Sequence, residues 1–213
     1  MPTPPSLRSV KIGADERGGW TTERPRREGD APPRPVDVSA RCRVLAPSDR
    51  LRYSPGSLLL IVSPNVSSSA RFAERVVEER GAVLSLAKVR TLLAGRVAVE
   101  EIEARARELL DAAVVKRLGE RQTVVLILEG LDAGERERYV RLAHGLKRPR
   151  HLILLEVPRD QVPEEERTTL NELRRTLDAG EVGLEGFQTA LRLGGGTMAE
   201  VKRIVFQPPP RED

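Results

Sequence analysis

The chain has very few of the residues from which disulfides, metal centres and aromatic platforms are built. Its 213 residues include one cysteine, Cys42, and two histidines, His144 and His151, which fall in different predicted elements. A disulfide within the chain and a metal site of several cysteines are therefore excluded, and a zinc centre is disfavoured. Aromatic residues make up 3% of the chain, and its single tryptophan, Trp20, stands in a polar segment. A lone Trp there is either an exposed side chain or an anchor for a partner.

Long apolar runs are also missing. No stretch approaches the ~18 apolar residues of a membrane span, and the first residues lack the apolar centre of a secretion signal. We therefore expect a cytoplasmic protein that makes no contact with membranes. The abundance of Arg, Ala, Leu and Val is typical of proteins from GC-rich bacterial genomes.

The positive charge is concentrated near the N-terminus. Of 36 Lys/Arg and 32 Asp/Glu in the chain, residues 1–55 contain 11 and 7, which leaves 25 of each for residues 56–213. The same segment holds 9 of the 16 prolines. Such a composition predicts a mostly disordered arm and linker over 1–55, with some strand-like alternation in 36–51. This arm is either a solvated Arg-rich tail or a docking segment for a protein or nucleic-acid partner.

From residue 56 to residue 207, short apolar runs alternate with amphipathic helical stretches. This alternation predicts a three-layer α/β domain with a mainly parallel sheet of about five strands, followed by a tail over 208–213. The strand over 58–62 is expected to be central, next to 123–128. The other expected strands are 82–86, 151–155 and 201–206, and the helices are 69–80, 88–93, 99–117, 134–146 and 164–179. The loops at the carboxyl ends of the strands are expected to form a cleft.

The first of these loops has the layout of a phosphate-binding loop without its defining residues. The pattern G-x-x-x-x-G-K-[ST] uses glycines to wrap phosphates, a lysine to neutralise them and a hydroxyl to bind Mg²⁺. On this pattern, Ser63 and Ser68 stand at the glycines, Ser69 at the lysine and Ala70 at the hydroxyl. All four positions differ. The sequence therefore predicts the scaffold of the loop and a loss of its metal ligand.

Residues 57–192 resemble the P-loop kinases of the polynucleotide kinase type, which include zeta-toxin-like kinases and are often labelled AAA-family ATPases. The resemblance is one of order and spacing. In that family an Asp-x-x-Arg element helps to position the phosphoryl acceptor, and here Arg90 is present while Ala87 replaces the acid. The family's next strand ends in Asp-x-Thr-Asn, with an arginine nine residues after the Asp. Glu129, Asp132 and Arg138 occupy the first, last and arginine positions.

Two later segments extend the resemblance. The run 152–158 matches the family's fourth strand, and 184–192 is similar to its Glu-Gly-Phe-Asp segment, with Gln188 in place of Asp. Between them the family has a lid whose arginines reach the transferred phosphate, and this chain is expected to have a shortened lid. The run Gly194–Gly196 predicts a flexible loop, and the basic run 147–150 predicts a solvated connection with weak potential to contact phosphates.

The resemblance implies a set of site residues. Glu129 and Asp132 are the candidate catalytic carboxylates. The candidate nucleotide- or phosphate-binding residues are Ser67, Ser68, Ser69, Arg71, Arg90 and Arg138. Arg71 lies two residues after the lost lysine and is the candidate substitute cation. For the three serines there is a simpler alternative, because serine also caps helices without any ligand.

These residues favour a degenerate polynucleotide kinase-like protein that acts as a binding or regulatory module, with weak or no phosphoryl transfer. ATP binding is expected to be weak and to depend little on Mg²⁺, since Ala70 cannot ligate the ion. No metal site is predicted. Two alternatives remain open. One is an active ATP-dependent kinase or NTPase that uses Arg71 as the cation and Glu129 with Asp132 for the metal, and the other is a structural subunit of a larger assembly, tethered by residues 24–35.

The composition of the arm leads to a test of domain organisation. We expect deletion of residues 1–35 to leave the thermal unfolding transition of the domain in place, because this segment has few apolar groups to offset its chain entropy. Calorimetry of the full chain and the truncated chain checks this. If the truncated chain were unfolded, the arm would be an integral packing element.

Overall fold

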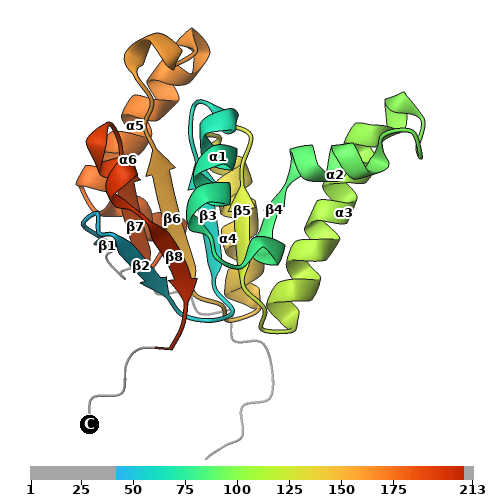
Figure 1. Ribbon diagram of the computed structural model, residues 1–213, viewed down its shortest axis with the longest axis horizontal. Helices are drawn as coiled ribbons and strands as arrows, with labels where there is room; N and C mark the ends of the chain where they lie inside the picture. Colours follow the sequence, from blue (N-terminus) through green and yellow to red (C-terminus); the bar gives the residue numbers. More distant parts are fainter. Residues whose placement is uncertain (1–41, 209–213) are drawn as a thin grey trace, which may run out of the picture. The chain divides into compact units, whose positions relative to one another are not determined.

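The structure is a computed structural model that describes residues 42–208 (Figure 1). Trp20 and most of the predicted arm lie outside the described residues. The fold is α/β, with a central sheet of six parallel strands in the order β1-β7-β6-β3-β5-β4. This confirms the predicted fold class and adds one strand to the expected five. The strands are β1 (Arg43–Val44), β3 (Leu58–Val62), β4 (Val83–Ser85), β5 (Val124–Ile127), β6 (Arg150–Leu155) and β7 (Thr189–Leu193).

Strand β3 is central, as predicted, between β5 and β6. Its five residues are apolar and all are fully buried. A strand that is covered on both faces needs apolar residues at every position, and it must pair along both edges to satisfy its backbone. The continuous Leu/Ile/Val run of this segment meets both requirements.

The residues of the sheet divide between two hydrophobic cores, one on each face. Leu58, Leu60 and Val62 point to the face covered by α3 (Val99–Gly119), α4 (Ala133–Gly145) and α5 (Arg167–Asp178). Leu59 and Ile61 point to the other face, which packs against α1 (Val66–Val76). Figure 1 shows α1 and the short helix α6 (Gly196–Glu200) in front of the sheet and α4 behind it.

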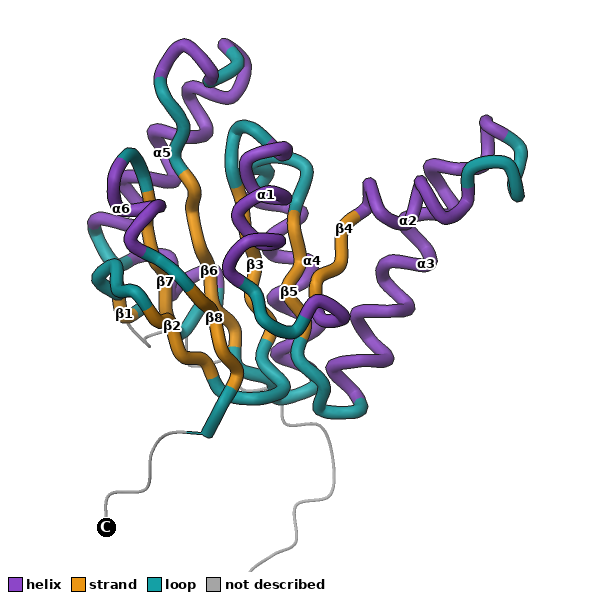
Figure 2. Tube along the Cα trace, in the orientation of Figure 1, coloured by secondary structure: helices purple, strands orange, loops and turns teal. Residues whose placement is uncertain are grey.

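The remaining helix is α2 (Leu86–Leu93), which packs against α3 beside the edge strand β4. Figure 2 shows this pair extending away from the sheet. Four short 3₁₀ segments complete the chain: η1 (Arg80–Ala82), η2 (Arg159–Gln161), η3 (Glu164–Glu166) and η4 (Glu181–Glu185). The predicted helices are all present, although α1 begins three residues earlier than expected and ends four residues earlier.

Two strands of the C-terminal region differ from the prediction. The segment 201–206 was expected to close the central sheet, but β8 (Arg203–Phe206) instead pairs with β2 (Arg50–Tyr53) in a separate parallel pair. The position next to β6 is taken by β7, which lies between β6 and the edge strand β1 and was not predicted as a strand. Arg192 interrupts its apolar pattern, and its two neighbours Leu191 and Leu193 are fully buried.

The described part of the 1–55 segment belongs to the folded domain. Strand β1 pairs with β7, and β2 places Leu51 and Tyr53 in the core on the α1 side. The strand-like alternation in 36–51 therefore continues into two strands, and the domain begins before residue 56.

A buried ion pair connects α4 to η4. The Arg136 side chain is 4% exposed, and its Nε and Nη2 donate to the two carboxylate oxygens of Glu185, both at 2.9 Å. Its Nη1 donates to the carbonyl oxygen of Leu131. The guanidinium is thus paired with a carboxylate, and each of its three nitrogens donates a hydrogen bond. A buried arginine requires such partners.

A second buried titratable group lies near the amino ends of the strands. His151 of β6 packs against Tyr53 with ring centroids 4.6 Å apart, and its Nδ1 lies 2.8 Å from the Thr189 hydroxyl. Burial, and to a smaller extent the nearby Arg150 charge, lower the pKa of His151 from 6.5 to about 4. The folded chain therefore keeps this histidine neutral under conditions in which the unfolded chain protonates it.

This difference in pKa predicts a pH-dependent stability. Between about pH 6.5 and pH 4 the unfolded chain binds a proton that the folded chain does not, so the free energy of unfolding decreases as the pH falls through this window. The full loss amounts to about 3 kcal/mol. Denaturant unfolding of the wild type and of His151→Gln at pH 7 and pH 5 measures it, and the variant should lose less stability between the two values.

His144→Gln is the matched control, because the second histidine is exposed. It should keep the wild-type difference between pH 7 and pH 5. An equal pH dependence in the wild type and in His151→Gln would show that His151 does not contribute.

Candidate functional site

The candidate site lies at the carboxyl edge of the sheet. Because all six strands are parallel, the loops that follow β3, β5, β6 and β7 meet at this edge. The loops contribute Ser63–Asn65, Glu129, Glu156 and Gly194, respectively. The parallel topology of the sheet therefore brings the loops of the predicted cleft together at one edge.

The loop after β3 is a tight, asparagine-capped turn. Only Ser63, Pro64 and Asn65 separate β3 from α1. The Asn65 side chain accepts a hydrogen bond from the Ser68 backbone N–H at 3.2 Å, and the Asn65 N–H donates to the Ser63 hydroxyl at 3.1 Å. Helix α1 has thus already begun before the positions that align with the second glycine and the lysine of a phosphate-binding loop. The helix cap explains why the predicted start at residue 69 was three residues late.

The three candidate serines have different environments. Ser67 is exposed and Ser68 is partly buried, so both lie at the accessible start of α1. Ser69 is fully buried on the face of α1 that packs against the sheet, and its hydroxyl has no hydrogen-bond partner. Arg71 is exposed, and its Nε donates to the Ser67 carbonyl oxygen of its own helix at 3.3 Å.

The structure brings two candidates, Arg90 and Glu129, into direct contact. Arg90 of α2 makes two hydrogen bonds to the Glu129 carboxylate, one of them with an Nη2–Oε2 distance of 2.9 Å. Its Nε also donates to Glu103 of α3 at 2.7 Å. Hydrogen bonds from Arg90 and Arg107 lower the pKa of Glu103 to about 2, and the bonds to Glu103 and Glu129 raise the pKa of Arg90. Glu129 is therefore a partner of a charged guanidinium rather than a free carboxylate.

The other two candidates have structural contacts. Asp132 is the N-cap of α4, and its carboxylate accepts a hydrogen bond from the Glu135 N–H at 2.7 Å. Arg138 forms an ion pair with Asp111 of α3, and Asp111 also accepts a hydrogen bond from the Tyr139 hydroxyl at 3.0 Å. Arg138 thus joins α4 to α3, and no contact connects it to Glu129 or Ser68.

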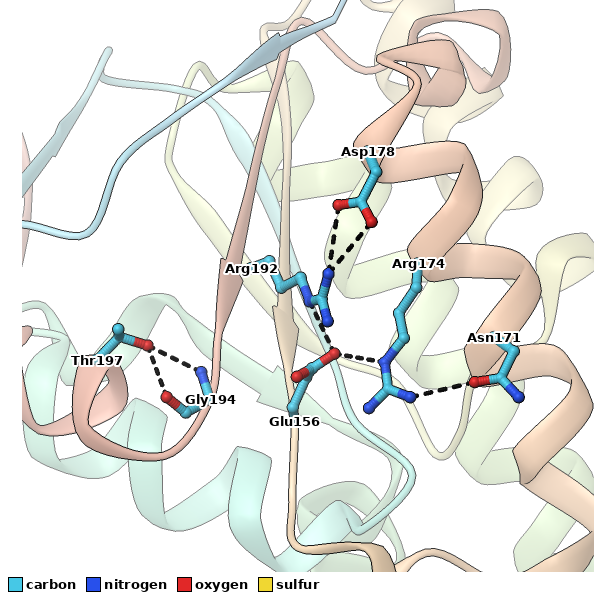
Figure 3. Close-up of polar contacts among 7 residues, drawn as sticks. All are labelled: Glu156, Asn171, Arg174, Asp178, Arg192, Gly194 and Thr197. Atoms are coloured by element: carbon cyan, nitrogen blue, oxygen red, sulfur yellow. Dashed lines mark hydrogen bonds and ion pairs between the residues drawn. The ribbon is translucent and has the colours of Figure 1, made fainter.

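Sequence reasoning missed a second charged group at this edge. Glu156 directly follows β6, and one of its oxygens accepts from Arg174 Nε at 2.5 Å and from Arg192 Nε at 2.8 Å. Burial raises the pKa of Glu156, and the two arginine hydrogen bonds lower it by more, so the carboxylate stays ionised. Figure 3 shows Glu156 between these two arginines, with Asp178 beside Arg192. The position of Glu156 after a buried strand was a signal for it, but Arg192 lies on the strand that was not recognised.

The glycine-rich loop after β7 packs closely against Glu156. A Cβ on Gly194 would lie 3.1 Å from both the Cβ and Oε2 of Glu156, so a larger residue would fit only if the Glu156 side chain shifted. The Thr197 hydroxyl donates to the Gly194 carbonyl oxygen at 2.8 Å and accepts from its N–H at 2.9 Å (Figure 3). Gly194–Gly196 is therefore a closed turn in this structure.

Two cavities with arginine in their walls open beside these loops. One, of about 390 Å³, is lined by side chains that follow β6, among them Arg159, Arg167 and Arg174. The other, of about 360 Å³, lies between α1 and α6 and includes Ser68, Arg71 and Arg75. Both sets of side chains are suited to bind anions. Within residues 42–208, no three His, Cys, Asp or Glu side chains come together in a group that could hold a metal ion.

Comparison with known proteins gives little beyond the fold. No family model matches the chain, and no curated protein matches it. Among solved structures, the tunicamycin resistance protein of Deinococcus radiodurans is similar in 72% of this chain and 99% of its own, with 18% identity and a TM-score of 0.37. The match is distant, and it adds nothing to the α/β fold described above. None of the helices between residues 42 and 208 is long and apolar enough to cross a membrane.

The burial of Ser69 leads to a prediction about the loop. We expect Ser69→Lys to destabilise the domain by about 3–5 kcal/mol, because the new cation would be buried without a partner. Ser67→Lys, two positions earlier and exposed, should change stability by no more than about 0.5 kcal/mol. Denaturant unfolding of both variants measures the difference. A stable Ser69→Lys variant that gains nucleotide affinity would instead indicate a loop with the shape of a true phosphate-binding loop.

Proposed function

We propose that this protein binds phosphorylated ligands at the carboxyl edge of its sheet and acts as a binding or regulatory module, without efficient phosphoryl transfer. The observation that carries the proposal is that the carboxylates at this edge already accept hydrogen bonds from other residues of the domain. Glu129 is paired with Arg90, Asp132 caps α4, and Glu156 is shared by two arginines.

Phosphoryl transfer requires a free base and a bound metal ion close to the phosphates. A carboxylate held in two hydrogen bonds by a guanidinium has its lone pairs directed at that partner, which opposes both roles. The loop after β3 also supports this conclusion. Its Ser68 N–H already donates a hydrogen bond to the Asn65 side chain, and Ala70 has no side-chain oxygen that could bind a metal ion. These contacts support a module in which catalysis has been lost or is very slow.

Groups that attract an anion are nevertheless present. Among residues 42–208, the N–H groups of Val66 and Ser67 have no hydrogen-bond acceptor outside the helix, and the start of a helix attracts negative charge. Ser67, Ser68 and Arg71 lie at this end of α1. The two arginine-lined cavities beside the loops add further cations. A nucleotide or another ligand with several phosphates fits this distribution of charge.

Calorimetric titration of the full chain with ATP and with GTP tests the proposal. We expect weak binding that changes little when Mg²⁺ is added. Arg71→Gln should weaken it about tenfold, the effect of one charged hydrogen bond. Arg80→Gln, an exposed arginine beyond the C-terminal end of α1, is the matched control and should bind like the wild type. No saturable binding of either nucleotide would contradict the proposal.

Hydrolysis assays with the same nucleotides separate the module from an enzyme. Losing one well-placed electrostatic contact costs on the order of 10²–10³ in rate, and here both the lysine and the metal-binding hydroxyl are missing. We therefore expect negligible turnover. Robust hydrolysis by the wild type that disappears in Glu129→Gln would favour an active kinase or NTPase with an unusual loop.

A further inference from the structure

A separate group of basic side chains lies at the other edge of the sheet, where α4 ends and β6 begins. A cavity of about 550 Å³ opens there. Its charged and titratable lining consists of His144, Lys147, Arg148 and Arg150, and Gln188 adds an amide. The site is distinct from the one described above, because β6 begins at Arg150 and reaches the carboxyl edge only at Leu155.

This group differs from the groups around Arg90, Arg136 and Arg192 in its lack of carboxylates. Arg90, Arg136 and Arg192 each have at least one Glu or Asp partner. The lining of the 550 Å³ cavity contains no Asp or Glu. Within residues 42–208, none of its four cationic or titratable side chains forms an ion pair.

The two arginines of the group, Arg148 and Arg150, have no charged hydrogen-bond partner among the described residues. Arg150 donates from Nε to the Gly186 carbonyl oxygen at 2.7 Å, and its Nη1 lies 3.0 Å from Nδ1 of His144. Arg148 has a buried Nε without a hydrogen-bond partner among the described residues. A buried donor of this kind is costly unless an acceptor is supplied. Burial also lowers the pKa of Arg150, which is the sign of a charge that lacks compensation.

The backbone fixes this arrangement. Lys147 has a φ of 57°, and its N–H donates to the His144 carbonyl oxygen at 2.9 Å. The Arg148 N–H donates to the Ala143 carbonyl oxygen at 2.8 Å, so both residues are tied to the last turn of α4. Cations near the C-terminus of a helix are favoured by its dipole, which accounts for the location of His144 and Lys147. The dipole does not supply an acceptor for the buried Nε of Arg148.

From the cavity, the absence of carboxylates and the unpartnered guanidinium nitrogen, we infer that this cluster is a second anion site that binds phosphate groups. Arg148 and Lys147 are the residues that contact the anion, and Arg150 positions the wall of the site through Gly186 and His144. A phosphate provides several acceptors for forked guanidinium donors and carries more than one negative charge. The ligand class is a compound with adjacent phosphates or a run of phosphodiesters.

Calorimetric titration of the full chain with pyrophosphate, in chloride buffer without Mg²⁺, tests this site. Lys147→Gln and Arg148→Gln should each weaken pyrophosphate binding by about tenfold, and the double variant by more. Arg141→Gln is the matched control, since it removes one positive charge from the neighbouring helix α4 at a residue that does not line the cavity. It should stay within about threefold of the wild type, in line with the small effect of an exposed charge.

Two further measurements identify the source of the phosphate and distinguish binding at this site from binding at the carboxyl edge. A single-stranded oligonucleotide of about ten nucleotides should bind more tightly than pyrophosphate, and with a steep salt dependence, if nucleic acid is the ligand. Similar affinities would point to a small ligand. In either case the binding must fall in Lys147→Gln and Arg148→Gln, while Arg71→Gln leaves this second site intact.

The inference is overturned if the double variant binds pyrophosphate and the oligonucleotide as the wild type does, or if neither probe binds the wild type. Lys147 is exposed, so its substitution leaves the fold unchanged. The Lys147→Gln variant therefore carries the test even if Arg148→Gln lowers the unfolding temperature.

Discussion

The fold depends on the complete burial of β3. Each of its five residues is fully covered, its backbone pairs with β5 on one side and β6 on the other, and its side chains alternate between the two cores. A strand in this position cannot tolerate a polar residue or a missing neighbour, so helices must cover both faces of the sheet. The helices that cover the faces are the crossover connections between parallel strands, and parallel strands bring the loops that follow them together at one edge. The candidate site exists because of that alignment.

Arginine serves two different purposes in this domain. At the carboxyl edge and on α4, guanidinium groups are matched with carboxylates, as in Arg90 with Glu129 and Arg136 with Glu185. Such pairs hold elements together and leave little charge for a ligand. At the start of β6, Arg148 and Arg150 have no carboxylate partner among the described residues. The first kind of arginine stabilises the fold, and the second kind is the basis of the proposed phosphate site.

The sequence predicted an element correctly wherever a local residue pattern was compatible with only one kind of element. Buried strands such as 58–62 and 123–128 are continuous apolar runs that fit no other element, and the helices have clear periodicity. The strand 189–193 was missed because Arg192 interrupts its pattern, and the position of 203–206 was wrong because its pairing with 50–53 depends on a contact across about 150 residues. Among site residues, Arg90 and Glu129 come together, Asp132 is a helix cap, and Arg138 turns toward α3. Spacing in the chain could not separate these cases, because it does not show which element packs beside each side chain.

By itself, the sequence determined the α/β class, the central strand, and the absence of a phosphate-binding lysine and a metal-binding hydroxyl at positions 69 and 70, because these follow from residue type and local period. Only the tertiary structure decided which charges are paired. Glu156 meets Arg174 and Arg192 from two other elements, and Ser69 is buried because α1 begins at Val66 and turns that face toward the sheet. Whether a charged side chain is a partner, a cap or a free binding group depends on which elements the fold places beside it, and that information is spread over the whole chain.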